Sequence, residues 1–231
     1  NDMHHLAALI EQSSDDIERI IVVTESIFSM DGDRADLKAL VSLKAQDPRI
    51  ELYIDEAHAV GVLGHNGLGL AEETQTLEEI DYLVGTFGKA FASMGAYVIC
   101  DKSIREWLVN QMRSFIFSTA LPPITHCWTR FVLAKMPTLY NLRTHLADLS
   151  VRVSQAINAD SDMAYQSPII PYILGDNASA VQKAQQLQQA GFYALPIRPP
   201  TVPVGTARIR LVMNAKLTTA DCDRLIEQLT S

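Results

Sequence analysis

The alternation of short β-branched runs with amphipathic segments constrains the fold of this chain more than any other feature. Residues 19–24 (RIIVVT) are typical of a strand that is buried on both faces. A helical pattern follows at 35–46, and residues 51–55 (ELYID) predict the next strand. Further elements are strands at 82–86, 96–100 and 115–118 and a helix at 103–111. Strands that alternate with helices indicate an α/β fold whose sheet is mostly parallel.

The pattern changes after Leu121-Pro122-Pro123, where long helical periodicities begin. The later elements are predicted helices at 124–135, 139–157, 178–190 and 218–229, and predicted strands at 169–174, 192–195 and 208–212. Thr218 and Asp221 have the spacing of a capping box at the start of the last helix. We therefore expect a large α/β domain at 1–138 and a smaller α+β C-terminal domain at 139–231.

Composition excludes several classes of protein. The 231 residues are 48% hydrophobic, which is enough to bury a core and argues against a disordered chain. The longest apolar runs are far short of the roughly 20 residues that a membrane-spanning helix needs. A net charge of −8 argues against a nucleic-acid partner, which would need a basic surface. The three cysteines, Cys100, Cys127 and Cys222, show no CxxC spacing, so we expect reduced thiols and a cytoplasmic protein.

Three segments directly after predicted strands could carry chemistry, because ligands bind at the carboxyl ends of strands in open α/β sheets. They are SIFSMDGD at 26–33, DEAH at 55–58 and TFGK at 86–89. The DEAH tetrapeptide also suggests a helicase, but nucleotide hydrolysis needs a phosphate loop with the pattern GxxxxGK[ST]. Ala90 follows the Gly-Lys pair here, and Leu83 stands at the position of the first glycine. A metal site is equally incomplete, because no second His or Cys lies at a ligand spacing from His58.

Lys89 lies on a tight, glycine-flanked turn at a strand end, which suits covalent chemistry on a carbonyl group. A single lysine at a strand end is usually a solvated surface residue. Asp55 and His58 follow the neighbouring predicted strand, and this conjunction favours a catalytic lysine. A lysine that binds a cofactor aldehyde, with an aspartate partner for a pyridinium nitrogen, is the chemistry of pyridoxal 5′-phosphate (PLP).

Four motifs occur in a specific order along the chain. They are DEAHAVG at 55–61, GTFGKAFASMG at 85–95, FSTALPP at 117–123 and IRPPTVP at 197–203. In this order they resemble the α-oxoamine synthases, which are PLP-dependent transferases of aminotransferase fold type I. The combination of IRPPTVP with GTARIRL is most similar to the member that condenses L-alanine with a pimeloyl thioester, on CoA or acyl-carrier protein, in biotin synthesis. The departures are Ala92 in the pair Ala92-Ser93, where the motif more often has Gly-Ser, and Ala59, where some members have Gly.

The resemblance implies PLP as the cofactor and gives roles to the residues around it. Lys89 would bind PLP covalently, and Asp55 would pair with the pyridine nitrogen. His58 would donate a hydrogen bond to the phenolic oxygen, near which Ser29 would also lie. Thr86 would bind the phosphate.

The resemblance also implies a homodimer with shared active sites, because Ser118 and Thr119 would reach the phosphate bound to the other subunit. The substrates would be an amino acid and an acyl thioester. Arg210 would hold the amino-acid carboxylate as a bidentate partner. Arg198 would lie near the acyl substrate.

Plainer roles remain open for some of these residues. Ser29 also fits a simple turn residue, and Arg198 also fits a structural arginine. Arg208 and Arg210 share one side of their predicted strand, so one of the two is expected to point at a ligand. Glu56 is expected to lie behind the turn that follows the strand rather than to take part in catalysis.

Members of the family have an upstream half with a small-residue phosphate loop and a histidine that stacks on the PLP ring, and neither occurs here. We therefore expect this chain to be the later part of such an enzyme, with the second part of the PLP-binding large domain at 1–138. Two alternatives stay open. One is another α-oxoamine synthase, which would use glycine with acetyl-CoA or serine with a long-chain acyl donor. The other is a non-catalytic partial chain that cannot bind PLP.

Overall fold

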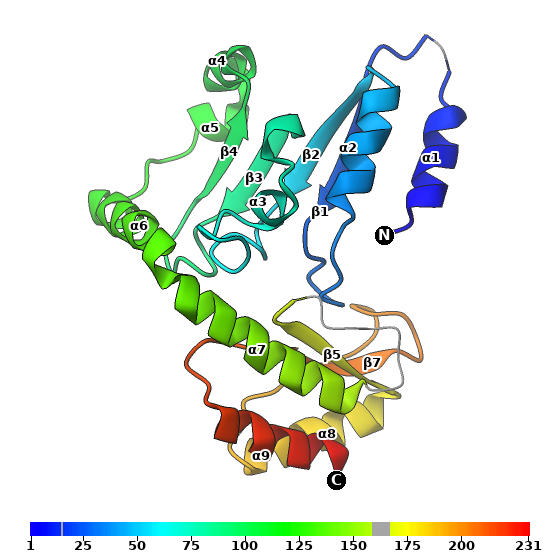
Figure 1. Cartoon of the computed structure of the whole chain (residues 1–231), viewed down its shortest axis with the longest axis vertical. Coiled ribbons are helices and arrows are strands. Elements are labelled where there is room, and N and C mark those ends of the chain that lie inside the picture. The colour runs from blue at the N-terminus through cyan, green and yellow to red at the C-terminus, as the bar shows by residue number, and fades with distance from the viewer. Residues whose placement is uncertain (15, 159–166) are drawn as a thin grey trace. The chain divides into compact units, whose positions relative to one another are not determined.

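The computed structural model describes residues 1–14, 16–158 and 167–231, and these form two compact units (Figure 1). The first unit contains Asn1–Ile27 and Ala35–Tyr140. The second contains Phe28–Arg34 and Asn141–Ser231. The loop after the first strand therefore belongs to the second unit, although the segments on both sides of it belong to the first.

The sheet of the first unit runs in the order β1-β2-β3-β4. Its strands are β1 (Ile20–Glu25), β2 (Ile50–Asp55), β3 (Tyr82–Thr86) and β4 (Ala96–Cys100). Strands β1, β2 and β3 are mutually parallel, and β4 is antiparallel to β3. The register pairs Glu25 with Asp55 and Asp55 with Val84. The carboxyl ends of three strands thus meet at one edge, as expected for a mostly parallel α/β sheet.

The helices of the first unit are α1 (Met3–Glu11), α2 (Leu37–Gln46), α3 (Leu70–Thr74), α4 (Lys102–Gln111), α5 (Arg113–Ile116) and α6 (Pro123–Lys135), with 3₁₀ turns η1 (Leu77–Glu79) and η2 (Met136–Leu139). Three of these helices, α2, α4 and α6, begin within two residues of the predicted positions. Helix α2 packs against β2 through its buried Leu37 and Leu40 (Figure 1). The Asp36 carboxylate caps α2 by accepting a hydrogen bond from the Ala39 amide.

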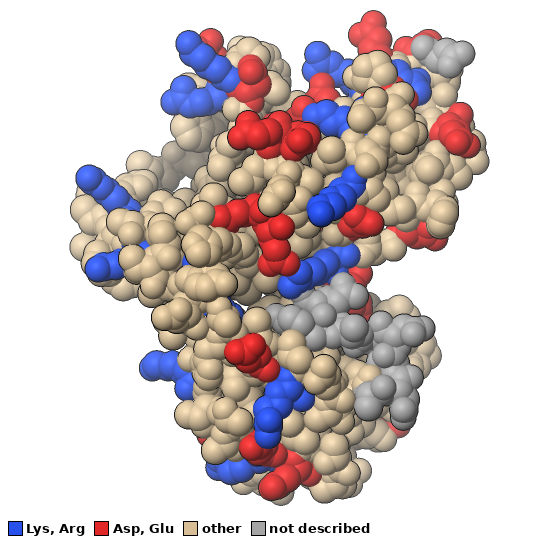
Figure 2. Space-filling view, viewed as in Figure 1, with Lys and Arg blue, Asp and Glu red and all other residues tan. Residues whose placement is uncertain are grey.

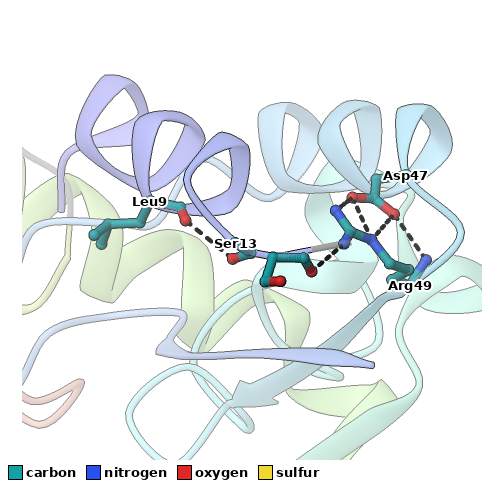
Figure 3. Close-up of polar contacts among 5 residues, drawn as sticks. Leu9, Ser13, Asp47 and Arg49 are labelled. Atoms are coloured by element: carbon teal, nitrogen blue, oxygen red, sulfur yellow. Dashed lines mark hydrogen bonds and ion pairs between the residues drawn. The ribbon is translucent and has the colours of Figure 1, made fainter. Parts of the chain in front are cut away.

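Arginine at position 49 links the end of α1 to the turn between α2 and β2 (Figure 3). Its guanidinium forms a bidentate ion pair with Asp47, with Nη2 2.7 Å from Oδ2. Nη1 donates to the Ser14 carbonyl at 3.3 Å. Ser13, next to it, donates from its hydroxyl to the Leu9 carbonyl in the last turn of α1. These contacts tie the segment after α1 to the turn before β2, and α1 itself packs against α2.

The two faces of this sheet differ in burial. Val22, Leu52 and Leu83 lie on the buried face, whereas Ile21 and Val23 are 55% and 68% exposed on the other face. The expectation that β1 is buried on both faces is therefore wrong for the described residues, because α2 covers one face only. We call the exposed side the open face. Residue alternation puts Asp55 and Thr86 on it, since their strand neighbours Ile54 and Gly85 are buried.

The second unit is an α+β structure around the antiparallel sheet β5-β7-β6. Its elements are α7 (Tyr140–Ile157), which begins at the last residue of the first unit, β5 (Ile169–Gly175), α8 (Asn177–Gln189), β6 (Pro196–Ile197), β7 (Ala207–Val212) and α9 (Thr219–Thr230). Helix α8 packs on all three strands and on α9; Figure 1 shows α8 beside α9. The predicted capping box is confirmed: the Asp221 amide donates to Thr218 Oγ1 at 3.2 Å, and the Thr218 amide donates to Asp221 Oδ2 at 3.0 Å.

Two predicted strands are wrong. Residues 115–118 continue the short helix α5 into a turn, with the Ile116 and Phe117 amides bonded to carbonyls four residues earlier. Residues 192–195 belong to no strand, and β7 pairs instead with Pro196–Ile197. A cavity of about 270 Å³ lies between residues 192–194 and 210–213. A short apolar run does not by itself distinguish a strand from a helical turn, and most of the apolar side chains in these two runs are exposed.

The surface carries both signs of charge. Figure 2 shows Lys and Arg side chains among Asp and Glu side chains over the face in view. Within the described residues, no helix is both long enough and apolar enough to cross a membrane.

Candidate active site

The carboxyl end of β2 presents Asp55 on the open face. Asp55 Oδ1 accepts a hydrogen bond from the Ala57 amide at 2.8 Å, which fixes the carboxylate relative to the turn. Oδ2 has no hydrogen-bond or ion-pair partner among the described residues. The Asp55 carbonyl accepts from the Ser26 amide at 2.9 Å and from its hydroxyl at 3.2 Å. The carboxylate is thus held by one oxygen and is open at the other.

Glu56 lies behind this turn, as predicted, and is fully buried. Its carboxylate accepts hydrogen bonds from the Ala71 amide at 2.7 Å and from the Leu70 amide at 3.0 Å. Burial raises the pKa of Glu56 above its ordinary value, and these amide bonds partly offset the rise. Glu56 therefore links the Asp55 turn to the start of α3 and faces away from solvent. His58, three residues after Asp55, is half-buried on the same turn.

The carboxyl end of β3 continues into a closed turn at residues 87–95. The Phe87 amide donates to the Gly95 carbonyl at 2.9 Å, and the Ser93 amide donates to the Phe87 carbonyl at 2.8 Å. Thr86 Oγ1 accepts from the Gly88 amide at 3.1 Å. Lys89 lies on this turn with an exposed side chain, and its amine has no partner within residues that the structure describes.

Tyr97 on β4 lies across Gly85, so closely that a Cβ at position 85 would overlap the phenol ring. Burial is the main cause that raises the pKa of Tyr97 to about 12, and the nearby carboxylates of Glu56 and Asp55 add to it. The phenol is therefore a neutral group against the buried side of the site. The sequence alone gave no reason to single out Tyr97.

Ser118 and Thr119 follow α5 on an exposed stretch of chain. The Ser118 hydroxyl donates to the Ser114 carbonyl. Asp55, His58, Thr86 and Lys89 occupy the ends of two adjacent parallel strands, whereas Ser118 and Thr119 lie beyond β4. The first unit therefore brings together four of the six residues that the sequence assigned to it.

The second unit holds Ser29, Arg198 and Arg210. Ser29 is half-buried in the loop at 28–34, which the second unit carries. In this loop the Gly32 amide donates to the Phe28 carbonyl at 2.9 Å. Gly32 has a φ of +72°, and a Cβ there would overlap the Ile169 carbonyl oxygen. Arg198 is exposed beside the cis peptide bond Pro199-Pro200.

The two arginines on one side of β7 have different surroundings. Arg208 is buried, forms an ion pair with Asp31 and donates from Nε to the Thr206 carbonyl at 3.0 Å. Arg210 is half-buried, and its Nε is buried without a hydrogen-bond partner in the described part of the chain. Burial lowers the pKa of the Arg210 guanidinium. Of the two, Arg210 is the one with a buried nitrogen that has no hydrogen-bond partner among the described residues.

The chemistry of these groups suits an organic cofactor rather than a metal. Within the described residues, no group of three or more His, Cys, Asp and Glu side chains could hold a metal ion. The groups present are the free amine of Lys89, the Asp55 carboxylate with one open oxygen and the Thr86 hydroxyl on the same face. They suit a heterocycle that is held covalently and carries a phosphate group. The open oxygen of Asp55 and the free amine of Lys89, both in the first unit, are the observations on which this fit depends.

Comparison with known proteins gives matches over almost the whole chain. Residues 1–229 match the family described as aminotransferase class I and II. The 8-amino-7-oxononanoate synthase of Haemophilus ducreyi is 54% identical over 232 residues, which cover 98% of this chain and 60% of that protein. The chain thus spans less than two thirds of the length of such relatives.

Solved structures agree with the sequence match. The serine palmitoyltransferase of Sphingomonas wittichii superposes with a TM-score of 0.92 at 28% identity, over 99% of this chain and 58% of that one. A structure of SPT with a PLP internal aldimine superposes with a TM-score of 0.91 at 27% identity, with the same coverage. These likenesses confirm the predicted α/β fold of type I, with a mostly parallel sheet and a smaller antiparallel one. By its sequence, this chain belongs to the aminotransferase class I and II family.

Proposed function

We propose that this chain carries part of the active site of a PLP-dependent 8-amino-7-oxononanoate synthase. The reaction would condense L-alanine with a pimeloyl thioester of CoA or acyl-carrier protein, with release of CO₂ and the free thiol, in biotin synthesis. The proposal rests on two groups that follow the ends of adjacent parallel strands. The Lys89 amine on the closed turn has no partner among the described residues, and the Asp55 carboxylate is open at Oδ2. The 54% identity to an 8-amino-7-oxononanoate synthase supports the choice of substrates.

Lys89, Asp55, His58, Thr86 and Ser29 would hold the cofactor. When bound, PLP supplies an electron-accepting ring that stabilises negative charge at the amino-acid Cα. The Lys89 amine would attach the cofactor and then take the Cα proton once the amino acid displaces it. The Asp55 carboxylate would keep the pyridine nitrogen protonated, because an adjacent negative charge favours the cationic ring. His58 and Ser29 would bind the phenolic oxygen, and the Thr86 hydroxyl would bind the phosphate.

Arg210 would orient the substrate by binding the carboxylate of alanine through two parallel hydrogen bonds. Its buried Nε lacks a partner, which supports this role because an unsatisfied buried donor is costly without one. Arg208 is already paired with Asp31 and would have no such role. Arg198 would lie near the acyl chain. Positioning of the carboxylate and the Cα bond is the main contribution that these residues would make.

We also propose a homodimer in which Ser118 and Thr119 reach the phosphate of the other subunit. Large apolar side chains around this segment are exposed: Phe117 is 73% and Ile124 is 75% accessible. An exposed apolar surface of this kind is typical of a protein interface. The three cysteines are free thiols, which supports the cytoplasmic location.

Replacement of the lysine tests the proposal. In the whole gene product that contains this chain, Lys89→Ala is expected to abolish turnover, the visible absorption of bound PLP and borohydride trapping of PLP on the protein. Lys102→Ala, which removes an exposed lysine of α4, is the matched control and should retain all three. A Lys89→Ala protein that still traps PLP would refute the assignment.

The nearest alternative is a related condensation with another amino acid. Serine palmitoyltransferases superpose closely on this chain, which gives serine with a long-chain acyl donor a specific basis. Turnover of alanine, glycine and serine with acetyl, pimeloyl and palmitoyl thioesters separates these activities. We expect alanine with the pimeloyl thioester to be preferred.

A further inference from the structure

The turn that carries Lys89 contains an unusual backbone conformation at Ala92. Its φ is +46°, in the left-handed region that L-residues other than glycine rarely occupy because Cβ approaches the neighbouring carbonyl. The Ala92 amide donates to the Lys89 carbonyl at 2.9 Å, so this conformation closes the turn directly behind the lysine. Contacts outside the turn must therefore hold Ala92 in place.

Helix α6 supplies those contacts from two adjacent residues. Trp128 Nε1 donates to the Ala92 carbonyl at 3.0 Å and to the Phe91 carbonyl at 3.3 Å. The Thr129 and Ser93 hydroxyl oxygens are 2.6 Å apart, and Thr129 Oγ1 also lies 2.9 Å from a carbonyl one helical turn earlier. Three consecutive residues of the turn are thus bonded to one helix.

Hydrogen bonds join α6 to residues 91–93 of the turn, and Val132 of α6 also packs against the cluster that contains Phe91. An open cavity of about 260 Å³ is lined by Ala92, Ser93 and Met94 from the turn and by α6 residues that include Trp128. On the other side, Phe91 is buried in a cluster with Val60 and Met136. The turn is therefore anchored in the core by Phe87 and Phe91, and residues 91–93 are bonded to α6 through the indole and hydroxyl groups.

We propose that Trp128 is a positioning residue for Lys89, with Thr129 in support, an inference that rests on the proposed function. The indole N–H holds the Phe91 and Ala92 carbonyls and keeps Ala92 left-handed. This fixes the direction in which the Lys89 side chain leaves the turn. Without the indole N–H, Ala92 relaxes toward ordinary backbone angles, and the Lys89 amine loses its alignment with the amino-acid Cα.

The test uses Trp128→Phe in the whole gene product, because phenylalanine keeps an aromatic ring and lacks the donor. Misalignment of a reacting group lowers turnover more than binding, so kcat should fall by about tenfold while KM for alanine changes less than about twofold. The rate at which PLP becomes attached to Lys89, followed by visible absorbance, should fall with kcat. Trp107→Phe removes the exposed indole of α4 and is the matched control, expected to leave both rates unchanged.

A second variant replaces Ala92 with glycine, because glycine adopts the left-handed conformation without a steric cost and does not need the indole to hold it there. The double variant Ala92→Gly/Trp128→Phe should recover kcat to within about threefold of the unsubstituted protein. Such a recovery would show that the effects of the two substitutions are not additive, as expected for residues in contact. A Trp128→Phe protein with an unchanged kcat, or with a lower melting temperature as its only change, would overturn the inference. A double variant as slow as Trp128→Phe would overturn it as well. If the unsubstituted protein does not attach PLP at Lys89, the proposed function itself is wrong. This result differs from one in which PLP is attached but Trp128→Phe has no effect, which would refute only the role of Trp128.

Discussion

Arg208 on β7 and Asp31 in the loop after β1 form an ion pair although 177 residues separate them in the chain. The Arg208 side chain is almost fully buried, whereas that of Asp31 is half exposed. The pair holds the loop that carries Ser29 to the sheet of the second unit. Arg210, the other arginine on this side of β7, has a buried Nε with no hydrogen-bond partner in the described part of the chain.

Removal of the Asp31 charge should destabilise the second unit. In Asp31→Asn the buried Arg208 guanidinium loses its counter-charge, and we expect a loss of about 1–3 kcal/mol because the exposed side of Asp31 admits water. Urea denaturation measures this loss. The control is Asp223→Asn, which breaks a surface pair with Arg152 whose Nε–Oδ1 distance is 2.6 Å. That change should cost under about 1 kcal/mol, and equal losses in the two variants would contradict the argument.

The electron-accepting role of the cofactor ring predicts a specific defect in Asp55→Asn. Asparagine can still accept the hydrogen bond from the Ala57 amide, so the turn should keep its shape. PLP should bind, but deuterium exchange at the alanine Cα should fall by at least about 10²-fold. Exchange measured by NMR at the unsubstituted rate would show that Asp55 does not stabilise the pyridinium.

Arg210→Met should weaken alanine binding with a smaller effect on protein stability. The loss of charge-assisted bonds to the substrate carboxylate should raise KM for alanine about 10- to 100-fold. Arg210→Lys should recover part of the loss, because an ammonium group keeps the charge but not the two-pronged geometry. The comparison variant Arg224→Met removes an exposed arginine of α9 and should not change KM. If Arg210→Met left KM unchanged, the carboxylate would be bound elsewhere.

Tyr97 predicts a pH effect on stability. Its pKa in the folded protein is about 12, and an unfolded tyrosine loses its proton near pH 10. Between about pH 10 and 12 the folded state therefore retains a proton that the unfolded state has lost, so stability falls as pH rises through this window. Tyr97→Phe should make that fall shallower and remove the last phase of tyrosinate absorbance in a pH titration. Tyr193→Phe, which removes an exposed phenol, should leave that phase in place.

Local patterns in the sequence predicted most of the secondary structure. Predicted strands at 82–86 and 96–100 coincide with β3 and β4, because β-branched and aromatic residues there are bounded by clear turns. The prediction failed at 115–118 and 192–195. There the apolar residues are exposed or unpaired, so burial did not impose the alternation that marks a strand.

The site was predictable to the extent that it follows from strand ends. Asp55, His58, Thr86 and Lys89 are each within three residues of the end of a parallel strand, where ligands bind in such sheets. The contact of Trp128 with Ala92 and the pair of Arg208 with Asp31 depend on how distant segments pack. No periodicity or spacing in one segment reveals a hydrogen bond to another, so these contacts required the structure.

The assignment of residues 28–34 to the second unit limits how this polypeptide can be divided. The main chain passes between the two units at three places, after Ile27, after Arg34 and after Tyr140. A fragment that begins at Asn141 would lack Asp31 and would keep a buried, uncompensated Arg208. A proteolytic cut near Tyr140 should therefore leave a C-terminal piece that is less stable than the same residues with the loop at 28–34 in place.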